Sequence, residues 1–269
     1  MPTGKTRIGN WQEEQAFVAA KRKALDEARS GGQMLSQQIV TKIRHHNQEC
    51  DLAPVEADGL LRFNVPIMLQ NGETDGFLAL DIHDRVEGPN GWKMIPTTVP
   101  QKKPVLRSAF VLVPIPSADD AFFADQGHGD VVHYGQKIAI QTHPGLLEEP
   151  LYLMSERKTP DSQSKVSGNQ AVYFTDEPGQ AGLWKIMYGN PEYREEMVGQ
   201  PVKANALIVV QHTPTNTPLA STKAKLVNDF GPEYEVCAHR YQTFRSKSGS
   251  APEEKAGFWA AVTAPSNVE

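Results

Sequence analysis

Few residues in this sequence have the types and spacing that catalysis requires. Ser162 and Lys165 fit the pattern S-x-x-K, in which a lysine lies beside a serine nucleophile. The residues around them are polar and typical of a loop, whereas the pattern needs a helix to bring the two side chains together. The segment 4–6 (GKT) is similar to the end of a phosphate-binding loop, but the upstream glycine and strand of that motif are missing. Neither pattern predicts an enzyme.

The histidines and carboxylates give no clear metal or acid–base site either. The eight histidines show no H-x-x-x-H spacing, and the two cysteines form no C-x-x-C pair. His128, Asp130 and His133 could form a loose metal site, and a solvated loop is the alternative interpretation. Glu148 and Glu149 are neighbours, and neighbours in a strand point apart, which makes them poor acid–base partners. We therefore expect no catalytic residue, cofactor or metal ion.

The chain is organised around a motif that occurs three times. Each copy has an apolar segment that ends on a glutamine, then a polar loop, then a second short apolar segment. The glutamines are Gln70, Gln141 and Gln211, which are 71 and 70 residues apart. Such self-similarity at a fixed period indicates a repeated structural unit.

A third element follows in each copy, where small and apolar residues precede an aromatic residue and a short strand. The aromatic residues are Phe110, Trp184 and Trp259. Three β units with a large residue at one matched place suggest a barrel closed by pseudo-threefold symmetry, which removes exposed sheet edges. The sequence thus predicts a mainly β protein, a β-trefoil whose three aromatic residues are equivalent in the core. A two-sheet sandwich with accidental matches is the alternative.

The N-terminal part has a helical composition. Residues 12–48 are rich in Ala, Lys, Glu, Arg and Gln, which favour helices. Trp11, Val18 and Leu25 are seven residues apart, and Gly31-Gly32 interrupts the pattern. We expect residues 1–50 to be an extension with one or two helices, and residues 60–265 to be the β domain. The narrow apolar stripes lie either on the β domain or on a partner protein.

Surface connections are expected between the repeated elements. The segment 81–107 holds four prolines, and the segments 114–130 and 155–170 are mostly polar. Such segments do not bury the hydrogen-bonding groups of a sheet, so we expect all three to be surface loops.

Composition excludes several classes of protein. The chain has 269 residues, a net charge of −5 and a pI of about 5.9, so nothing indicates nucleic-acid binding. Its longest apolar run is far below the roughly 18–20 residues that a membrane span needs. The first eleven residues are polar, so no secretory signal is expected. Two cysteines are too few for a disulfide framework, and a reducing compartment fits best.

Several motifs together resemble a known family. They are residues 7–11 (RIGNW), 134–135 (YG), 172–177 (VYFTDE), 193–213, 231–239 (GPEYEVCAH) and 258–259 (FW). In this order and spacing they resemble the cilia- and flagella-associated protein 161 family over nearly the whole chain, most densely from Val172 to Thr263. The Tyr-Gly pair before an apolar strand is also similar to trefoil modules called MIR domains.

The resemblance implies a structural protein and not an enzyme. It implies a microtubule inner protein of ciliary and flagellar axonemes. Such proteins bind tubulin on the lumenal face of A-tubule protofilaments of the doublet microtubules, near the seam and beside other inner proteins. The acidic tails of the microtubule exterior do not line the lumen, so the acidic charge of this chain is compatible with that place. Neither a nucleic acid nor a membrane is an expected partner.

For the contact with the partner, the motif at the N-terminus is the first candidate. It comprises Arg7, Ile8, Gly9, Asn10 and Trp11, and a short segment with a tryptophan and an arginine is suited to anchoring in a partner's pocket. The alternative is that Trp11 caps the chain's own barrel. A different class of function, a module that binds a small ligand of the sugar or inositol-phosphate type, predicts similar residues in equivalent loops. The loops after the glutamines share little beyond Thr74 and Thr215.

Overall fold

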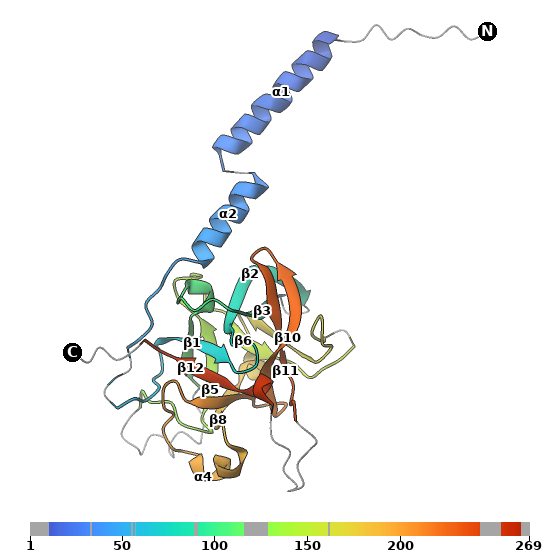
Figure 1. Cartoon of the computed structure of the whole chain (residues 1–269). Coiled ribbons are helices and arrows are strands. Elements are labelled where there is room, and N and C mark those ends of the chain that lie inside the picture. The colour runs from blue at the N-terminus through green and yellow to red at the C-terminus, as the bar shows by residue number, and fades with distance from the viewer. Residues whose placement is uncertain are drawn as a thin grey trace. The chain divides into compact units, whose positions relative to one another are not determined.

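The structure is a computed structural model that describes residues 11–32, 34–54, 56, 58–88, 91–115, 129–160, 162–242 and 254–264. Residue contacts divide the chain into two units, Met1–Arg44 and His45–Glu269. The first unit is helical and the second is built from strands (Figure 1).

Two helices, α1 (Trp11–Ser30) and α2 (Leu35–His46), form the arm that the composition predicts. Glu13 and Glu14 lie in the first turn of α1 and Arg29 in its last turn, so their charges complement the helix dipole. Gly32 follows with a positive φ of 70°, a conformation that ends helices and suits glycine. Among the described residues, no helix combines the length and apolarity that crossing a membrane demands.

The second unit contains twelve strands in one sheet among the described residues. Their bounds are β1 (Pro66–Asn71), β2 (Phe77–Gly88), β3 (Gly91–Val99), β4 (Phe110–Pro114), β5 (Lys137–Thr142), β6 (Tyr152–Ser155), β7 (Gln170–Thr175), β8 (Trp184–Tyr188), β9 (Leu207–His212), β10 (Thr217–Asn228), β11 (Gly231–Ala238) and β12 (Trp259–Val262). Short helices lie between some of them: η1 (Leu106–Ser108), η2 (Gly179–Gly182), η3 (Pro191–Tyr193), α4 (Arg194–Met197) and η4 (Lys255–Gly257).

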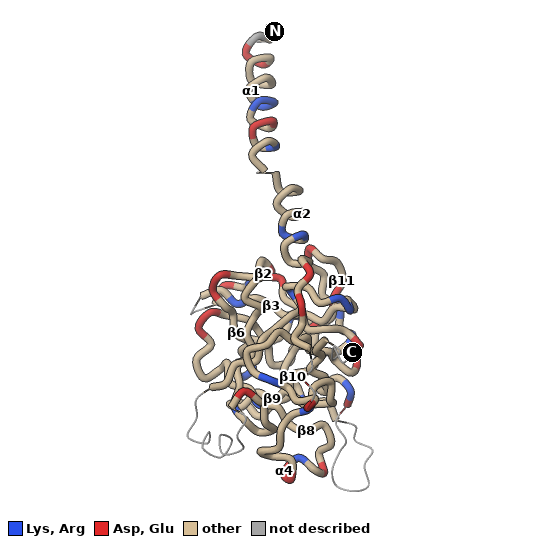
Figure 2. Tube along the Cα trace, turned by 90° about the vertical axis from the view of Figure 1, so that its left-hand side faces the viewer, with Lys and Arg blue, Asp and Glu red and all other residues tan. Residues whose placement is uncertain are grey.

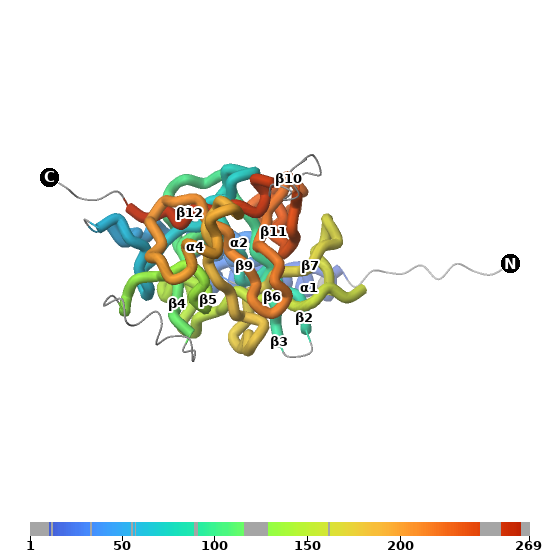
Figure 3. Tube along the Cα trace, turned by 90° about the horizontal axis from the view of Figure 1, so that it is seen from below, coloured from blue at the N-terminus to red at the C-terminus, as the bar shows by residue number. Residues whose placement is uncertain are grey.

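Six strands pair in a closed ring. β1 pairs with β4, β4 with β5, β5 with β8, β8 with β9, β9 with β12, and β12 with β1, always antiparallel. Because the last strand returns to the first, this ring has no open edge. Figure 3 shows β4, β5, β9 and β12 of this barrel from below.

The other six strands form three hairpins, β2–β3, β6–β7 and β10–β11. Their second strands also pair with one another, since β3 pairs with β7, β7 with β11, and β11 with β3. The hairpins therefore meet as a triangle of strands.

The expectation that the segment 81–107 is a surface loop is wrong up to Val99. Residues 81–88 continue β2, and β3 returns from Gly91 to Val99. The register shifts between Leu80 and Arg85, and four of the eight residues from Asp81 to Gly88 are charged and four are exposed. A strand without one buried face lacks the alternation of apolar and polar residues, so the sequence pattern did not indicate this part of the strand. The hairpin β10–β11 extends in the same way past a shift between Ser221 and Lys225.

The three glutamines occupy matched places in the pairing. Each lies opposite the start of the next strand: Gln70 opposite Phe77, Gln141 opposite Tyr152, and Gln211 opposite Pro218. The residue after each glutamine faces one of the three aromatic residues, in the pairs Asn71 with Trp259, Thr142 with Phe110, and His212 with Trp184.

A ring of three backbone hydrogen bonds lies before the barrel strands. Leu61 N donates to Val202 O at 2.8 Å, Val202 N donates to Val132 O at 2.8 Å, and Val132 N donates to Leu61 O at 2.9 Å. All three side chains are buried. Their spacing along the chain is the same 71 and 70 residues as that of the glutamines.

Left-handed residues set the direction in which three barrel strands begin. Asn64, Gly135 and Asn205 have φ values of 58°, 85° and 59°, and each lies two residues before β1, β5 or β9. Glycine and asparagine adopt this conformation most readily, which explains their presence in the three turns. At Gly135 an added Cβ would also lie 3.2 Å from the Val198 side chain.

The core is filled by the predicted aromatic residues. Phe110, Trp184 and Trp259 are fully buried, and Phe110 stacks on Phe174 with ring centroids 5.4 Å apart. Both indoles also satisfy their polar atom. Trp184 Nε1 donates to Leu153 O and Trp259 Nε1 to Leu219 O, each at 2.8 Å. Buried tryptophans need such a partner.

Candidate interaction surfaces

The predicted anchor motif is only partly described. Arg7, Ile8, Gly9 and Asn10 lie outside the described residues, and Trp11 is the first residue of α1. The Trp11 side chain is 67% exposed, so its indole is accessible to another surface.

Trp11 continues into an apolar stripe along α1. Val18 and Leu25 follow at intervals of seven residues, and Phe17 widens the stripe. All four side chains are exposed. Exposed aromatic and aliphatic side chains on one side of a helix are typical of a protein-binding surface.

The charges of the two helices differ. α1 carries acidic and basic side chains, including the pair Lys23–Glu27 at 3.9 Å, whereas α2 carries Lys42 and Arg44 and no acidic residue (Figure 2). Leu35 and Val40 of α2 are exposed apolar residues. The surface of α2 therefore suits an acidic partner with apolar contacts.

The first residues of the second unit, His45 and His46, are held by the β domain. His45 Nε2 lies 3.1 Å from Leu146 O, and His46 is fully buried with Nε2 3.9 Å from Asp81 Oδ1. The His46 ring also contacts Phe230, with centroids 5.4 Å apart. Asp81 comes from β2 and Phe230 from the turn between β10 and β11, so both long hairpins contribute to this contact.

A buried ion pair lies next to that contact. Arg107 Nη2 and Glu233 Oε1 are 2.9 Å apart, and both side chains are almost fully buried. Thr97 Oγ1 and Asn228 Nδ2 also donate to Glu233 Oε2, at 2.5 and 2.7 Å. The Arg107 guanidinium lies 3.8 Å from the centroid of the Phe230 ring. The pair therefore connects η1 to the hairpin β10–β11.

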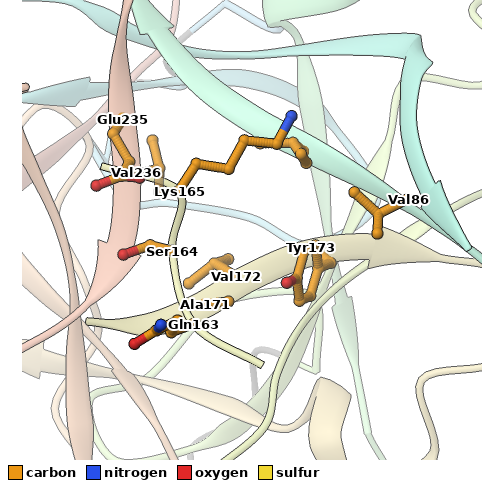
Figure 4. A pocket seen from close by; sticks show the side chains of 10 residues that line it. Val86, Gln163, Ser164, Lys165, Ala171, Val172, Tyr173, Glu235 and Val236 are labelled. Atoms are coloured by element: carbon orange, nitrogen blue, oxygen red, sulfur yellow. The ribbon is translucent and has the colours of Figure 1, made fainter. Parts of the chain in front are cut away.

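A cavity of about 200 Å³ opens where the three hairpins meet (Figure 4). Its walls are mainly apolar, from Val86 and Ile95 of the first hairpin, Ala171 and Val172 of β7, and Val236 of β11. The polar residues Gln163, Ser164, Lys165, Tyr173 and Glu235 complete the lining. This cavity is a candidate ligand site of the described β domain.

The S-x-x-K pattern lies beside this cavity, and its two residues make other contacts. Lys165 Nζ pairs with Asp84 Oδ1 at 3.4 Å, and Ser162 N donates to Thr159 O at 3.2 Å. Of the residues of the possible loose metal site, Asp130 binds Arg62 Nη1 through its carboxylate at 2.5 Å. His128 and the segment 4–6 lie outside the described residues. Among the described residues, no group of His, Cys, Asp and Glu could hold a metal ion.

Both cysteines are free thiols. Burial raises the pKa of Cys237, although Tyr241 and Asn169 lie within weak hydrogen-bonding distance of its sulfur, at 3.9 and 3.8 Å. Burial also raises the pKa of Cys50. A thiol whose pKa is raised is less often ionised at neutral pH and is therefore a poor nucleophile.

Sequence reasoning missed three buried charged or polar residues, Glu235, Arg107 and His46. Their roles come from contacts between segments far apart in the chain, such as the 126 residues between Arg107 and Glu233. Only the alternation of Glu233, Glu235 and Cys237 on one face of a strand could have indicated carboxylates directed inward.

Comparison with solved structures defines the class of fold. The SDF2-like protein from Arabidopsis thaliana aligns with a TM-score of 0.52 at 21% identity, covering 77% of this chain and 99% of that one. A Caenorhabditis elegans protein of unknown function aligns with a TM-score of 0.55 at 12% identity, covering 77% and 98%. At such identities the likeness concerns the fold alone. The β domain is mainly β and is similar in fold to the SDF2-like protein.

Comparison of sequences defines the relatives more narrowly. The model of the cilia- and flagella-associated protein 161-like domain matches residues 162–248. The Mus musculus protein of that name is 29% identical over 255 residues, which cover 87% of this chain and 80% of its own length. The Danio rerio protein is 25% identical over 254 residues, covering 88% and 81%. The resemblance seen in the motifs is confirmed, and this chain is similar to cilia- and flagella-associated protein 161 over most of its length.

Proposed function

We propose that this chain is a non-enzymatic structural protein of ciliary and flagellar axonemes. In this proposal it binds tubulin on the lumenal wall of the A-tubule of doublet microtubules, near the seam and beside other inner proteins, and stabilises the axoneme for motility. The observation that carries the proposal is the exposed apolar stripe of α1 on a chain whose relatives are named as cilia- and flagella-associated.

In this proposal the β domain is the part of the chain that is held in place on the microtubule wall. We propose that it is a β-trefoil, as the threefold sequence motif predicts. The closed ring of six strands, the triangle of hairpins and the ring of hydrogen bonds through Leu61, Val132 and Val202 support this topology. Such a body is rigid, because its strands are paired on both sides in the barrel.

The arm supplies the attachment. Trp11 begins the stripe of α1, and aromatic residues contribute most per residue to protein interfaces. The helix α2 carries two basic residues and no acidic one, so it would complement an acidic patch on the partner. In a repeating lattice many modest contacts act together, so a short arm suffices for stable attachment.

The proposal that no reaction is catalysed rests on the contacts of the candidate residues. The ammonium of Lys165 is engaged by Asp84 and the carboxylate of Asp130 by Arg62. A turnover assay that showed this chain consuming a substrate would reverse this part of the proposal.

The test compares two exposed tryptophans. Trp11→Ala removes the proposed anchor, and Trp92→Ala removes a half-exposed tryptophan of β3 as a matched control. Each variant is expressed in place of the parent chain, its fold is checked by circular dichroism, and axonemes are washed with increasing salt. We expect Trp11→Ala to be released at lower salt than the parent and Trp92→Ala to be retained. Retention of Trp11→Ala equal to that of the parent would remove the anchor role.

The alternative function is a small-ligand module of the sugar or inositol-phosphate type. The cavity beside Glu235 is the observation that favours a ligand of some kind. A buried carboxylate repels a phosphate, so the inositol-phosphate form of the alternative is disfavoured at this place. Micromolar binding in a glycan screen would support the sugar form.

A further inference from the structure

The carboxylate of Glu235 is an unusual component of the cavity among the hairpins. The side chain lines the cavity and is only 2% exposed. Its two oxygens accept hydrogen bonds from the backbone of the covering loop, Oε1 from Val166 N at 2.7 Å and Oε2 from Ser167 N at 2.8 Å. Both oxygens thus act as acceptors, as in an ionised carboxylate.

Lys165 lines the cavity and Lys93 lies over the ring of the cavity residue Tyr173, and both lysines are already paired. Lys165 is bound to Asp84, and Lys93 to Glu156 at 2.7 Å. Figure 4 shows the Lys165 ammonium directed away from Glu235. The ion pairs formed between described residues include none with Glu235. A buried carboxylate without a cation is costly, so a cationic group is the ligand that this cavity favours.

The walls define the rest of the ligand. Val86, Ile95, Ala171, Val172 and Val236 surround the space with apolar atoms, which suit an alkyl chain and not a hydrated metal ion. Because each Glu235 oxygen already accepts one N–H, a bidentate guanidinium is less well matched than a compact ammonium.

We propose that this cavity binds the side chain of a lysine from a protein neighbour, with the alkyl stem against the apolar walls and the ammonium on Glu235. That the neighbour is a protein of the ciliary axoneme rests on the function proposed above. The proposal that the cavity binds a lysine side chain does not rest on that function, and separate experiments test the two proposals.

The experiment uses the purified full chain with methyl groups of isoleucine and alanine labelled for NMR. It is titrated with N-acetyl-lysine methylamide and, separately, with the norleucine counterpart, which keeps the alkyl stem and lacks the ammonium. We expect the lysine ligand to shift the Ile95 and Ala171 methyl signals saturably and to bind at least about tenfold more tightly than the norleucine ligand, the factor that one charge-assisted hydrogen bond supplies.

Two variants show where the ligand binds. Val86→Phe fills the cavity from its half-exposed wall and leaves Glu235 unsubstituted. Val227→Phe places the same ring on an exposed site of β10 outside the cavity. We expect Val86→Phe to weaken lysine binding at least about tenfold and Val227→Phe to leave it unchanged.

Three results would overturn the proposal. They are the absence of saturable shifts in the parent chain, equal affinity for the lysine and norleucine ligands, and unchanged affinity in a folded Val86→Phe variant. Each would mean that Glu235 serves only to hold the loop that contains Val166 and Ser167. The parent titration decides the question even where Val86→Phe fails to fold, and it does so whether or not the chain is retained on axonemes.

Discussion

Replacing Arg107 by methionine tests how much the buried ion pair between Arg107 and Glu233 stabilises the β domain. The change removes a buried guanidinium and keeps most of its packing, so it leaves the carboxylate of Glu233 buried without its cation. Breaking a buried ion pair in this way costs about 3–5 kcal/mol. Thr97 and Asn228 still donate to Glu233, which moves the expected cost of Arg107→Met to the lower end, about 3 kcal/mol.

The free energy of unfolding in urea measures this cost. With a slope of about 2 kcal/mol per M, a loss of about 3 kcal/mol lowers the midpoint by roughly 1.5 M. The matched variant Arg107→Met/Glu233→Leu removes both charges, and we expect it to regain most of the stability, because replacing a whole buried pair by apolar residues is often close to neutral.

Two outcomes would refute this reasoning about the ion pair. One is a cost below about 1 kcal/mol for Arg107→Met, which is the range of exposed ion pairs. The other is a double variant that is no more stable than the single one, since the loss would then come from packing on Phe230 and not from an unpaired charge.

Three further predictions concern the core and its titrating groups. Trp184→Ala should lower the free energy of unfolding by about 3–5 kcal/mol, against less than about 1 kcal/mol for the exposed Trp92→Ala, measured in the same urea experiment. Burial lowers the pKa of His212 in the folded chain below the unfolded value of about 6.5. The unfolded chain therefore binds the proton more readily, and the free energy of unfolding falls as pH drops through the unfolded pKa, by at most about 1.4 kcal/mol per pH unit. The variant His212→Asn has asparagine, the residue found at the matched position 71. We expect its free energy of unfolding to fall less than that of the parent between pH 7.5 and 5.5. Because burial raises the pKa of the Cys237 thiol, this cysteine should react with a disulfide reagent far more slowly in the folded chain than in urea; equal rates would contradict its burial.

Much of the strand framework could be predicted because it leaves a regular record in the sequence. The three glutamines mark positions that the register aligns, and Phe110, Trp184 and Trp259 are buried as expected. An apolar strand that ends in a polar residue at a turn is a local feature, so a single sequence carries it.

The outer halves of the long hairpins could not be predicted in the same way. Beyond Leu80 and Ser221 the strands have exposed, charged side chains and shifted register, which remove the alternation that identifies a strand. The segment up to Gly88 therefore has the composition of a loop, although its backbone is paired with β3.

The candidate sites depend on contacts between residues far apart in the chain, so most of them could not be predicted from the sequence. The apolar stripe of α1 could be predicted from the spacing of Trp11, Val18 and Leu25, which is local, whereas its exposure could not. The cavity around Glu235 needs three hairpins and a loop to come together, and the sequence gives no indication of their meeting point. Lys165 was noted only as part of the S-x-x-K pattern, which did not predict an enzyme, and its ammonium is paired with Asp84.

A density map of native doublet microtubules from cells that carry this chain is the most direct test of the proposed function. We expect a body with the closed six-stranded ring on the lumenal wall of the A-tubule, with α1 and its Trp11 in contact with the wall or with a neighbouring inner protein. A lumen without this body, in axonemes that contain the chain, would contradict the account.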